Sequence, residues 1–243
     1  MLGETLTAAS IAGTTALAAW AVRGKSATIL APSEWEGTRT RASVSLTFDD
    51  GPSESTLDLL DVLDRWHVKA TFFQCGGNIR RLPGVAQEVL AAGHEIGNHT
   101  EHHPRFDFRS ARYIHQELEA AQNTIQEFVG IRPVLYRPPF GIRWFGMGRA
   151  QKKLGLKSVM WSCIGLDWRL GSSAIAARCS KAARSGAIYC LHDGREMQKK
   201  PNVRPAIEAV KRLIPELIDR GYDFETASEI LSPEPPVRLS GRG

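Results

Sequence analysis

The sequence predicts an α/β protein, a distorted, incomplete (β/α) barrel of about seven parallel strands with outer helices. Two observations support this fold class. First, apolar segments of strand length alternate with segments of helical periodicity from residue 43 to about residue 224. Second, none of the strand segments has a clean polar face, which is typical of parallel strands covered by helices. An open, doubly wound sheet with the same element order is the alternative architecture.

The predicted elements follow one another in strict alternation. Gly93 and Gly221 each follow a helical segment, where a left-handed residue commonly ends a helix. In either architecture the reactive side chains collect where the parallel strands end. We expect strands at residues 43–48, 70–73, 94–99, 133–137, 158–162, 187–191 and 222–224, and helices after Ser53, before Gly93, and near 110–128, 145–154, 173–184 and 204–220.

The chain divides into one domain at residues 26–232, a hydrophobic segment at 1–25 and a Pro-rich flexible tail at 233–243. Residues 6–22 contain no charged side chain and reach the lower length limit for crossing a bilayer. This weakly apolar run fits a membrane anchor, an atypical secretory signal or a helix packed against the domain. A cell-envelope or membrane-associated location is favoured, and a cytoplasmic one stays open.

Composition excludes several classes of protein. Hydrophobic residues make up 42% and charged residues 23% of the chain, which is typical of a soluble globular fold and not of a disordered or multispanning one. The net charge of +5 is not concentrated in one segment, so we expect no nucleic-acid partner. A monomer is favoured. The cysteines lack Cys-x-x-Cys spacing and should be buried free thiols, at Cys75, Cys163, Cys179 and Cys190.

Ionisable side chains follow five of the predicted strands. Singly, each has an ordinary structural explanation as a helix cap, a turn residue or a salt-bridge partner. Together they should meet at one mouth, and they are Asp49, Asp50, His99, His103, Arg137, Asp167 and His192. One helical turn would place His99 and His103 on the same side, with Pro104 ending that turn, whereas His102 falls outside the spacing.

This set of residues indicates metal-assisted hydrolysis. A carboxylate and two imidazoles supply three of the four ligands of a tetrahedral zinc site and leave one position for water. One of the two neighbouring aspartates can bind the metal while the other remains a base. His192, held protonated by Asp167, could donate a proton to a leaving group. Zn²⁺ suits the ligands, as do Co²⁺, Ni²⁺ and Mn²⁺. No Gly-rich phosphate loop suggests a nucleotide cofactor.

At these residues the chain resembles the polysaccharide deacetylases of carbohydrate esterase family 4, which carry the NodB-homology domain. The likeness extends over about residues 43–230 and rests on five motifs in order: TFDDGP (47–52), HTEHH (99–103), RPPFG (137–141), DW (167–168) and CLH (190–192). It implies metal-dependent hydrolysis of an N-acetyl, sometimes O-acetyl, group on an acetylated glycan that contains N-acetylglucosamine.

The resemblance also implies a role for each matched residue. Asp49 would be the catalytic base, oriented by Arg137, and His192 the general acid, tuned by Asp167. The metal ligands would be Asp50, His99 and His103. Trp168 and Cys190 would line the pocket for the acetyl methyl group, a backbone N–H near Phe140 or Gly141 would stabilise the oxyanion, and Pro139 belongs to the same substrate-binding motif.

Two departures from the family pattern bear on substrate preference. The fourth motif usually has Asp where this chain has Ile164, and the fifth usually has Leu where it has Cys190, which could enlarge the acyl pocket. Two alternatives stay open: a hydrolase of a small amide, a cyclic imide or an O-acetyl ester, and a non-catalytic glycan-binding relative. Trp144 and Phe145 could stack on a sugar ring or pack against the protein.

Overall fold

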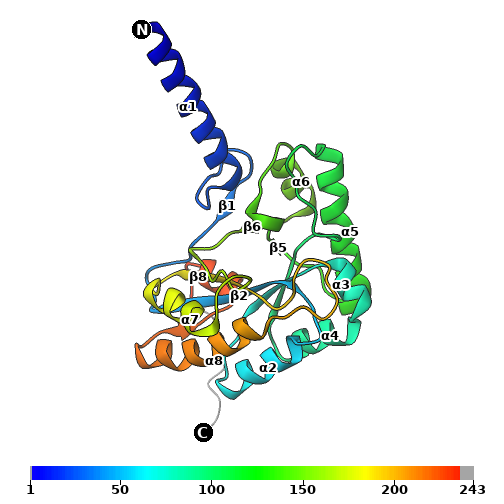
Figure 1. Cartoon of the computed structure of the whole chain (residues 1–243). Coiled ribbons are helices and arrows are strands. Elements are labelled where there is room, and N and C mark those ends of the chain that lie inside the picture. Colours follow the sequence, from blue (N-terminus) through cyan, green and yellow to red (C-terminus); the bar gives the residue numbers. More distant parts are fainter. Residues whose placement is uncertain (1, 236–243) are drawn as a thin grey trace.

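The computed structural model describes residues 2–235 and shows one parallel sheet that curls into an incomplete barrel with helices outside it (Figure 1). The strands lie in the order β1-β6-β5-β4-β3-β2-β8-β7, and β9 pairs with β2. Their bounds are β1 (Ser33–Glu34), β2 (Ser43–Gly51), β3 (Thr71–Gln74), β4 (Glu95–Asn98), β5 (Leu135–Tyr136), β6 (Lys157–Val159), β7 (Cys163–Ile164), β8 (Ala187–His192) and β9 (Asp223–Phe224).

Helices cover the outer face of the sheet. The main apolar core lies between the strands and helices α2, α4, α7 and α8, and a second cluster packs α5 and α6 against β5. The helices are α1 (Leu2–Arg23), α2 (Thr56–Arg65), α3 (Gly76–Arg81), α4 (Pro83–Ala91), α5 (Ala111–Val129), α6 (Met147–Leu154), α7 (Ser172–Lys181), α8 (Arg204–Asp219) and α9 (Ala227–Leu231), with a 3₁₀ turn at Pro139–Gly141.

Strand β2 shows how the sheet separates its two faces. Val44, Leu46 and Phe48 belong to the outer core beneath the helices. Because successive side chains of a strand point to opposite faces, the intervening residues, among them Thr47 and Asp49, point into the barrel. The central strand is therefore apolar outside and polar inside, and its polar row leads to the carboxyl end of the sheet.

A connecting segment closes the barrel between β6 and β7, which do not pair with each other. β6 pairs with β5 and β1 on one side of the sheet, whereas β7 pairs with β8 on the other. Residues 160–162 connect them: the Met160 amide donates to the Glu34 carbonyl at 2.6 Å and the Ser162 amide to the Ile188 carbonyl at 2.9 Å. At the amino ends of the strands, α9 contributes Ala227 and Ile230 to a core inside the barrel.

The predicted fold class is confirmed, with corrections to its elements. Of the expected strand at 158–162, only residues 158–159 are strand, at the end of β6, and residues 160–162 form a connection. The two-residue strands β1 and β7 were not predicted. Strands of two residues are too short to show a period of two, which explains both errors. The four cysteines are buried and free, as expected.

Helix α1 leads away from the barrel in Figure 1. Its last turn is fixed to the domain, because the Arg143 amide donates to the Val22 carbonyl at 2.9 Å, whereas Leu17 and Trp20 are exposed. Within residues 2–235 no helix meets the length and apolarity needed to span a membrane. Most of the tail expected to be flexible, residues 236–243, lies outside the described part of the chain.

Candidate active site

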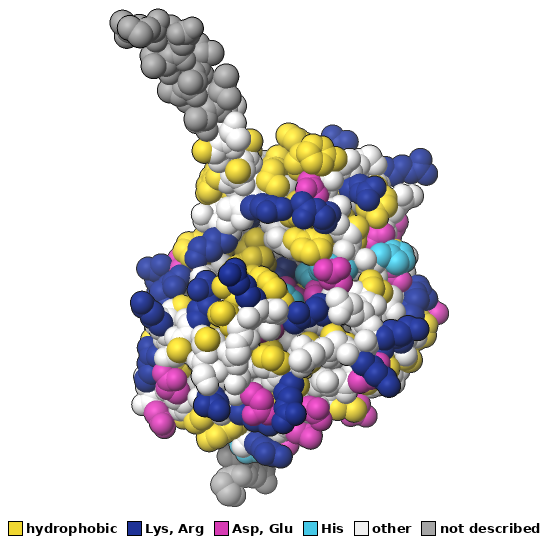
Figure 2. Space-filling view, in the orientation of Figure 1, with side chains coloured by type: hydrophobic (Ala, Val, Ile, Leu, Met, Phe, Trp, Pro, Cys, Tyr) yellow, Lys and Arg dark blue, Asp and Glu magenta, His cyan; other side chains and the backbone are white. Residues whose placement is uncertain are grey.

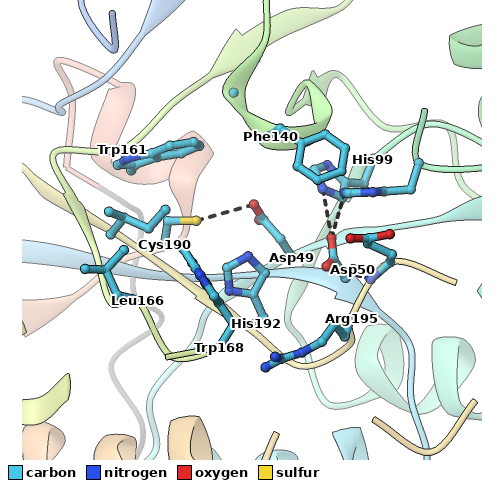
Figure 3. A pocket seen from close by; sticks show the side chains of 14 residues that line it. Asp49, Asp50, His99, Phe140, Trp161, Leu166, Trp168, Cys190, His192 and Arg195 are labelled. Carbon is cyan, nitrogen blue, oxygen red and sulfur yellow. Dashed lines mark hydrogen bonds and ion pairs between the residues drawn. The ribbon is translucent and has the colours of Figure 1, made fainter. Parts of the chain in front are cut away.

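A pocket of about 550 Å³ opens at the carboxyl ends of the strands (Figure 3). It brings together residues from the ends of β2 and β8 and from the segments after β4, β5 and β7. Its walls are formed by Asp49, Asp50, His99, His103, Phe140, Gly141, Trp161, Ile164, Leu166, Trp168, Cys190, His192, Arg195 and Glu196. Of the predicted site residues, Arg137, Pro139 and Asp167 are buried behind this surface.

The two neighbouring aspartates point in different directions because the strand contains an extra residue. Asp49 pairs with Phe73 and Gly51 with Gln74, so Asp50 is left as a β-bulge between them. Asp50 also has a left-handed backbone, with φ of 72°. The bulge turns the Asp50 side chain away from Asp49, and the two carboxylates therefore have separate sets of partners.

Asp50 meets two imidazoles on its side of the pocket. Its Oδ1 atom lies 3.2 Å from His99 Nε2 and 3.0 Å from His103 Nε2, and all three side chains are buried. The other carboxylate oxygen, Oδ2, accepts a hydrogen bond from the Glu196 amide at 2.8 Å. Burial raises the pKa of Asp50, but the contacts with His103 and His99 outweigh burial and hold it well below its ordinary value.

The two histidines converge without the helical turn that their spacing suggested, and that expectation was wrong. Residues 99–103 form an irregular loop in which Thr100 and His103 have positive φ angles of 69° and 55°. The loop is held by its own side chains: the Thr100 amide donates to Asn98 Oδ1 and the His103 amide to Thr100 Oγ1. His102 points outward to Glu117, at 3.0 Å, and takes no part in the cluster.

The cluster has the donor set and spacing of a divalent metal site. Asp50 Oδ1 is buried and accepts no hydrogen bond within the described chain, although both imidazoles face it. His99 Nδ1 donates to the Arg137 carbonyl at 2.8 Å, which leaves the Nε2 lone pair facing Asp50. Ligands about 2.1 Å from a tetrahedral ion lie roughly 3.4 Å apart, close to the separations observed here. The residues present therefore fit a metal.

Asp49 is fixed by a fully buried arginine. Arg137 Nη1 donates to Asp49 Oδ1 at 2.7 Å and to Thr47 Oγ1 at 2.6 Å, while Nε and Nη2 donate to the carbonyls of Val159 and Met160. This leaves Asp49 Oδ2 as the oxygen that faces the pocket. The Cys190 thiol lies 3.4 Å from that oxygen (Figure 3), and burial raises the pKa of the thiol well above its ordinary value.

His192 forms a charged pair with Asp167. His192 Nδ1 lies 2.8 Å from Asp167 Oδ1, and the His192 amide donates to Oδ2 of the same carboxylate at 2.9 Å. Burial lowers the pKa of His192, but the charge and hydrogen bond of Asp167 outweigh burial and raise it to about 9. At neutral pH the imidazole is therefore protonated, with Nε2 as its second donor.

A family model described as polysaccharide deacetylase matches residues 36–159. A peptidoglycan-N-acetylglucosamine deacetylase of Bacillus cereus is 33% identical over 201 residues, which cover 81% of this chain and 92% of that protein.

The chain belongs to the polysaccharide deacetylase family. A chitooligosaccharide deacetylase of Bradyrhizobium is 35% identical over 203 residues, covering 80% of this chain and 91% of that protein. One similar crystal structure is a mutant of a Bacillus anthracis pseudoenzyme of carbohydrate esterase family 4 with restored enzymatic activity. It covers 85% of this chain and 74% of its own, with a TM-score of 0.75 and 25% identity.

Only some of the residues that line the polysaccharide deacetylase pocket were predicted from the sequence. Trp168, Phe140 and Cys190 line it as expected, but Trp161 and Leu166 line it too and were missed. Trp161 lies in the segment that joins the two edges of the sheet and Leu166 directly before the expected DW motif, and no pattern in the sequence marks either as a pocket residue. The same holds for Arg195 and Glu196, which follow the CLH motif.

Trp144 and Phe145, in the loop after the 3₁₀ turn, were expected either to stack on a sugar ring or to pack against the protein. Trp144 packs against Phe108 at 4.9 Å and Phe145 at 5.4 Å between ring centroids, and neither Trp144 nor Phe145 lines the pocket. The aromatic ring that faces the metal cluster is Phe140 instead, 4.7 Å from the His103 ring in an edge-on arrangement. Of the two aromatic positions expected after Gly141, the structure therefore brings neither to the pocket.

Proposed function

We propose that this protein is a metal-dependent hydrolase that removes N-acetyl groups from a glycan containing N-acetylglucosamine. The observation that carries the proposal is the convergence of three metal-type ligand atoms, a carboxylate oxygen that faces the pocket and a protonated imidazole. An amide can be hydrolysed when its carbonyl is polarised, a water molecule is deprotonated and the leaving nitrogen is protonated. The pocket offers one group for each of these tasks.

Asp50, His99 and His103 would hold the metal, which acts as a Lewis acid toward the acetamide carbonyl and the attacking water. Asp49 would remove a proton from that water through Oδ2, because Arg137 already donates to Oδ1. The arginine thus fixes the direction of the base. Arg137 is itself fixed by the carbonyls of Val159 and Met160 and by the Phe73 ring, 4.2 Å from its guanidinium carbon.

The tetrahedral oxyanion needs a hydrogen-bond donor opposite the base. Of the two backbone amides expected to serve, that of Gly141 donates to the Pro138 carbonyl at 3.0 Å. The Phe140 amide is therefore the one we assign. Phe140 has a left-handed backbone, with φ of 57°, and its ring is partly exposed at the pocket edge.

His192 would protonate the leaving nitrogen through Nε2. Asp167 holds Nδ1 and the backbone amide of the same residue, so the imidazole has a fixed orientation and a fixed charge. The Trp168 ring stands edge-on to the imidazole, 5.3 Å away, and is half exposed. We assign Trp168, with Cys190 and Leu166, to the wall that receives the acetyl methyl group.

The proposed substrate class rests on the relatives. One is named for peptidoglycan N-acetylglucosamine and another for chitooligosaccharides, and both names share the N-acetylglucosamine unit. The seven predicted side chains of the metal, base and acid sets are present and gather at one pocket, which supports turnover over a purely binding role.

Acetate release tests the proposal. The metal-stripped full chain is incubated with N-acetylglucosamine oligomers, peptidoglycan fragments and small amides, with and without added Zn²⁺ or Co²⁺. We expect metal-dependent acetate release from the glycans. Turnover of the small amides alone would replace the proposal with the small-substrate hydrolase, and glycan binding without acetate release from the metal-loaded protein would replace it with a non-catalytic relative.

A further inference from the structure

A second hollow adjoins the candidate active site. Its volume is about 660 Å³, and it shares Trp161 and Ile164 with the active-site pocket, so the two hollows adjoin at these side chains. The rest of its surface comes from the segment between the sheet edges, from helix α7 and from Lys25 after α1. The lining residues are Lys25, Trp161, Ser162, Cys163, Ile164, Ala177, Arg178, Lys181 and Ala182.

The second hollow is cationic. Lys25, Arg178 and Lys181 line it, no carboxylate does, and none of the three forms an ion pair with another residue of the described chain. In Figure 2, Lys and Arg side chains gather beside the central hollow, over the region where Figure 1 shows α7. The residue on the shared wall, Ile164, is apolar and adds no negative charge to offset them.

Two of the cations are held in place by the wall itself. Lys25 Nζ donates to the Ser162 carbonyl at 2.8 Å, and Arg178 Nε donates to the Ile164 carbonyl at 2.7 Å. Each of these bonds uses one donor, so the Arg178 Nη groups and two Lys25 N–H groups remain for a ligand. These bonds fix the Lys25 and Arg178 charges at the chain segment that forms the shared wall.

A third hollow also adjoins the active-site pocket, at other residues than the second hollow does. It has a volume of about 380 Å³ and shares Trp168 and Arg195 with the active-site pocket. Arg169 also lines it, and its one carboxylate, Asp167, is paired with His192. The active-site pocket, which contains Asp49, thus adjoins both other hollows, and the cations that line those hollows form no ion pair within the described residues.

We propose that these hollows form one groove for a glycan strand that carries carboxylates near the N-acetylated sugar, and that Lys25, Arg178 and Lys181 bind one such carboxylate. This inference rests on the proposed function, because it names the class of glycan that the same site accepts. The planar guanidinium of Arg178 matches a carboxylate in two-point contact, and a lysine on each side adds charge. A neutral N-acetylglucosamine oligomer offers these cations no anionic partner.

The test compares three substrates: neutral N-acetylglucosamine oligomers, oligomers alternating N-acetylglucosamine with N-acetylmuramic acid, and oligomers alternating N-acetylglucosamine with glucuronic acid. The full-length variant Lys25→Gln/Arg178→Gln/Lys181→Gln removes the charges while glutamine keeps N–H donors for the two carbonyls. The matched control, Lys152→Gln/Lys153→Gln/Lys157→Gln, removes three exposed charges from α6 and β6 outside the groove. Lys181→Glu alone serves as a second variant, because no hydrogen bond of Lys181 can be lost.

The readout is the ratio of kcat/KM for a carboxylate-bearing oligomer to that for the neutral one. We expect the groove variant to lower this ratio roughly tenfold relative to wild type at low salt, with a smaller difference at high salt because screening weakens exposed charges. The control should keep the wild-type ratio, and Lys181→Glu should lower it. An unchanged ratio in the groove variant would overturn the proposal. Comparison of the two carboxylate-bearing oligomers shows which carboxylate source is preferred.

Calorimetric binding of the same oligomers separates this proposal from the proposed function. If wild type releases no acetate from any glycan, the deacetylase assignment fails, yet weaker binding of carboxylate-bearing oligomers by the groove variant still supports the groove. The opposite outcome is acetate release while the groove variant keeps the wild-type oligomer affinities and kcat/KM ratio. That result would exclude the proposed carboxylate-binding groove and leave the deacetylase assignment in place.

Discussion

Two groups of side chains face the same pocket but differ in how their polar atoms are satisfied. In the Asp167–His192 pair, each carboxylate oxygen has a hydrogen-bond partner and the imidazole is fixed at Nδ1. In the cluster of Asp50, His99 and His103, Asp50 Oδ1 has two imidazole nitrogens 3.0 and 3.2 Å away but no hydrogen bond. A divalent cation between these three atoms would give the buried oxygen a partner without requiring either imidazole to be protonated.

The two groups therefore differ in whether protein atoms alone satisfy their polar atoms. The Asp167–His192 pair satisfies its own polar atoms, whereas the proposed function completes the cluster with a cation. Removing a member of the Asp50–His99–His103 cluster should therefore abolish metal binding. Replacing Asp167 should instead change the proton affinity of His192.

The largest effect should follow from breaking the cluster. We expect His99→Ala to abolish metal binding and lower kcat/KM at least roughly a thousandfold, because the Lewis acid contributes several kcal/mol to transition-state stabilisation. Bound metal is counted by elemental analysis and activity by acetate release. His102→Ala is the matched control, because His102 lies three residues away and contacts Glu117. Metal retained at full stoichiometry in His99→Ala would remove this residue from the ligand set.

Replacing the base should separate metal binding from turnover. Asp49→Asn keeps the shape of the side chain but cannot accept a proton, so we expect kcat to fall by roughly a hundredfold to ten-thousandfold. Metal content should stay at the wild-type value, because Asp49 does not belong to the ligand cluster. Near-normal acetate release by the metal-loaded variant would show that another group deprotonates the water.

The Asp167–His192 pair makes a smaller, pH-dependent prediction. Asp167 raises the pKa of His192 to about 9, so the general acid is present through neutral pH and is lost above that value. Asp167→Asn should move the alkaline limb of the kcat profile toward lower pH and reduce kcat at pH 8 by about tenfold, within the range for general-acid catalysis. An alkaline limb at the same pH in both proteins would exclude His192 as the acid.

The same pKa has a consequence for stability with a defined sign. Folding raises the pKa of His192 from 6.5 to about 9, so folding favours its protonated form. This stabilisation is complete below pH 6.5 and is lost as the pH rises to about 9. Denaturant unfolding of wild type should therefore lose more free energy over this interval than unfolding of Asp167→Asn.

The smallest effect concerns the acyl pocket. Cys190 is smaller than the leucine usual for the family at this position, and its side chain lines the pocket next to Asp49. We expect Cys190→Leu to lower the ratio of N-propionyl to N-acetyl release by roughly fivefold, since one or two methylene groups in an apolar pocket discriminate by about 1 to 3 kcal/mol. Equal ratios would show that Cys190 does not set the acyl size.

Much of this site could be predicted because its residues lie where parallel strands end. Asp49, Arg137 and His192 occupy the positions that the strand pattern gave them. The path of the chain between those positions could not be predicted. The bulge at Asp50 and the pairing of β7 with β8 depend on contacts with distant strands, which no local pattern records. The loop that presents His103 is held by local side-chain hydrogen bonds and positive φ angles, which residue spacing does not reveal. For the same reason Trp161 and Leu166 were missed.

The central claim is that the Asp50–His99–His103 cluster binds a catalytic metal. The most direct measurement titrates Zn²⁺ into the metal-stripped full chain and records bound metal and acetate release from an N-acetylglucosamine oligomer in the same samples. We predict that one equivalent binds, that activity rises in proportion to it, and that His99→Ala shows neither response while His102→Ala shows both. Full activity without bound metal, or stoichiometric binding by His99→Ala, would contradict the account.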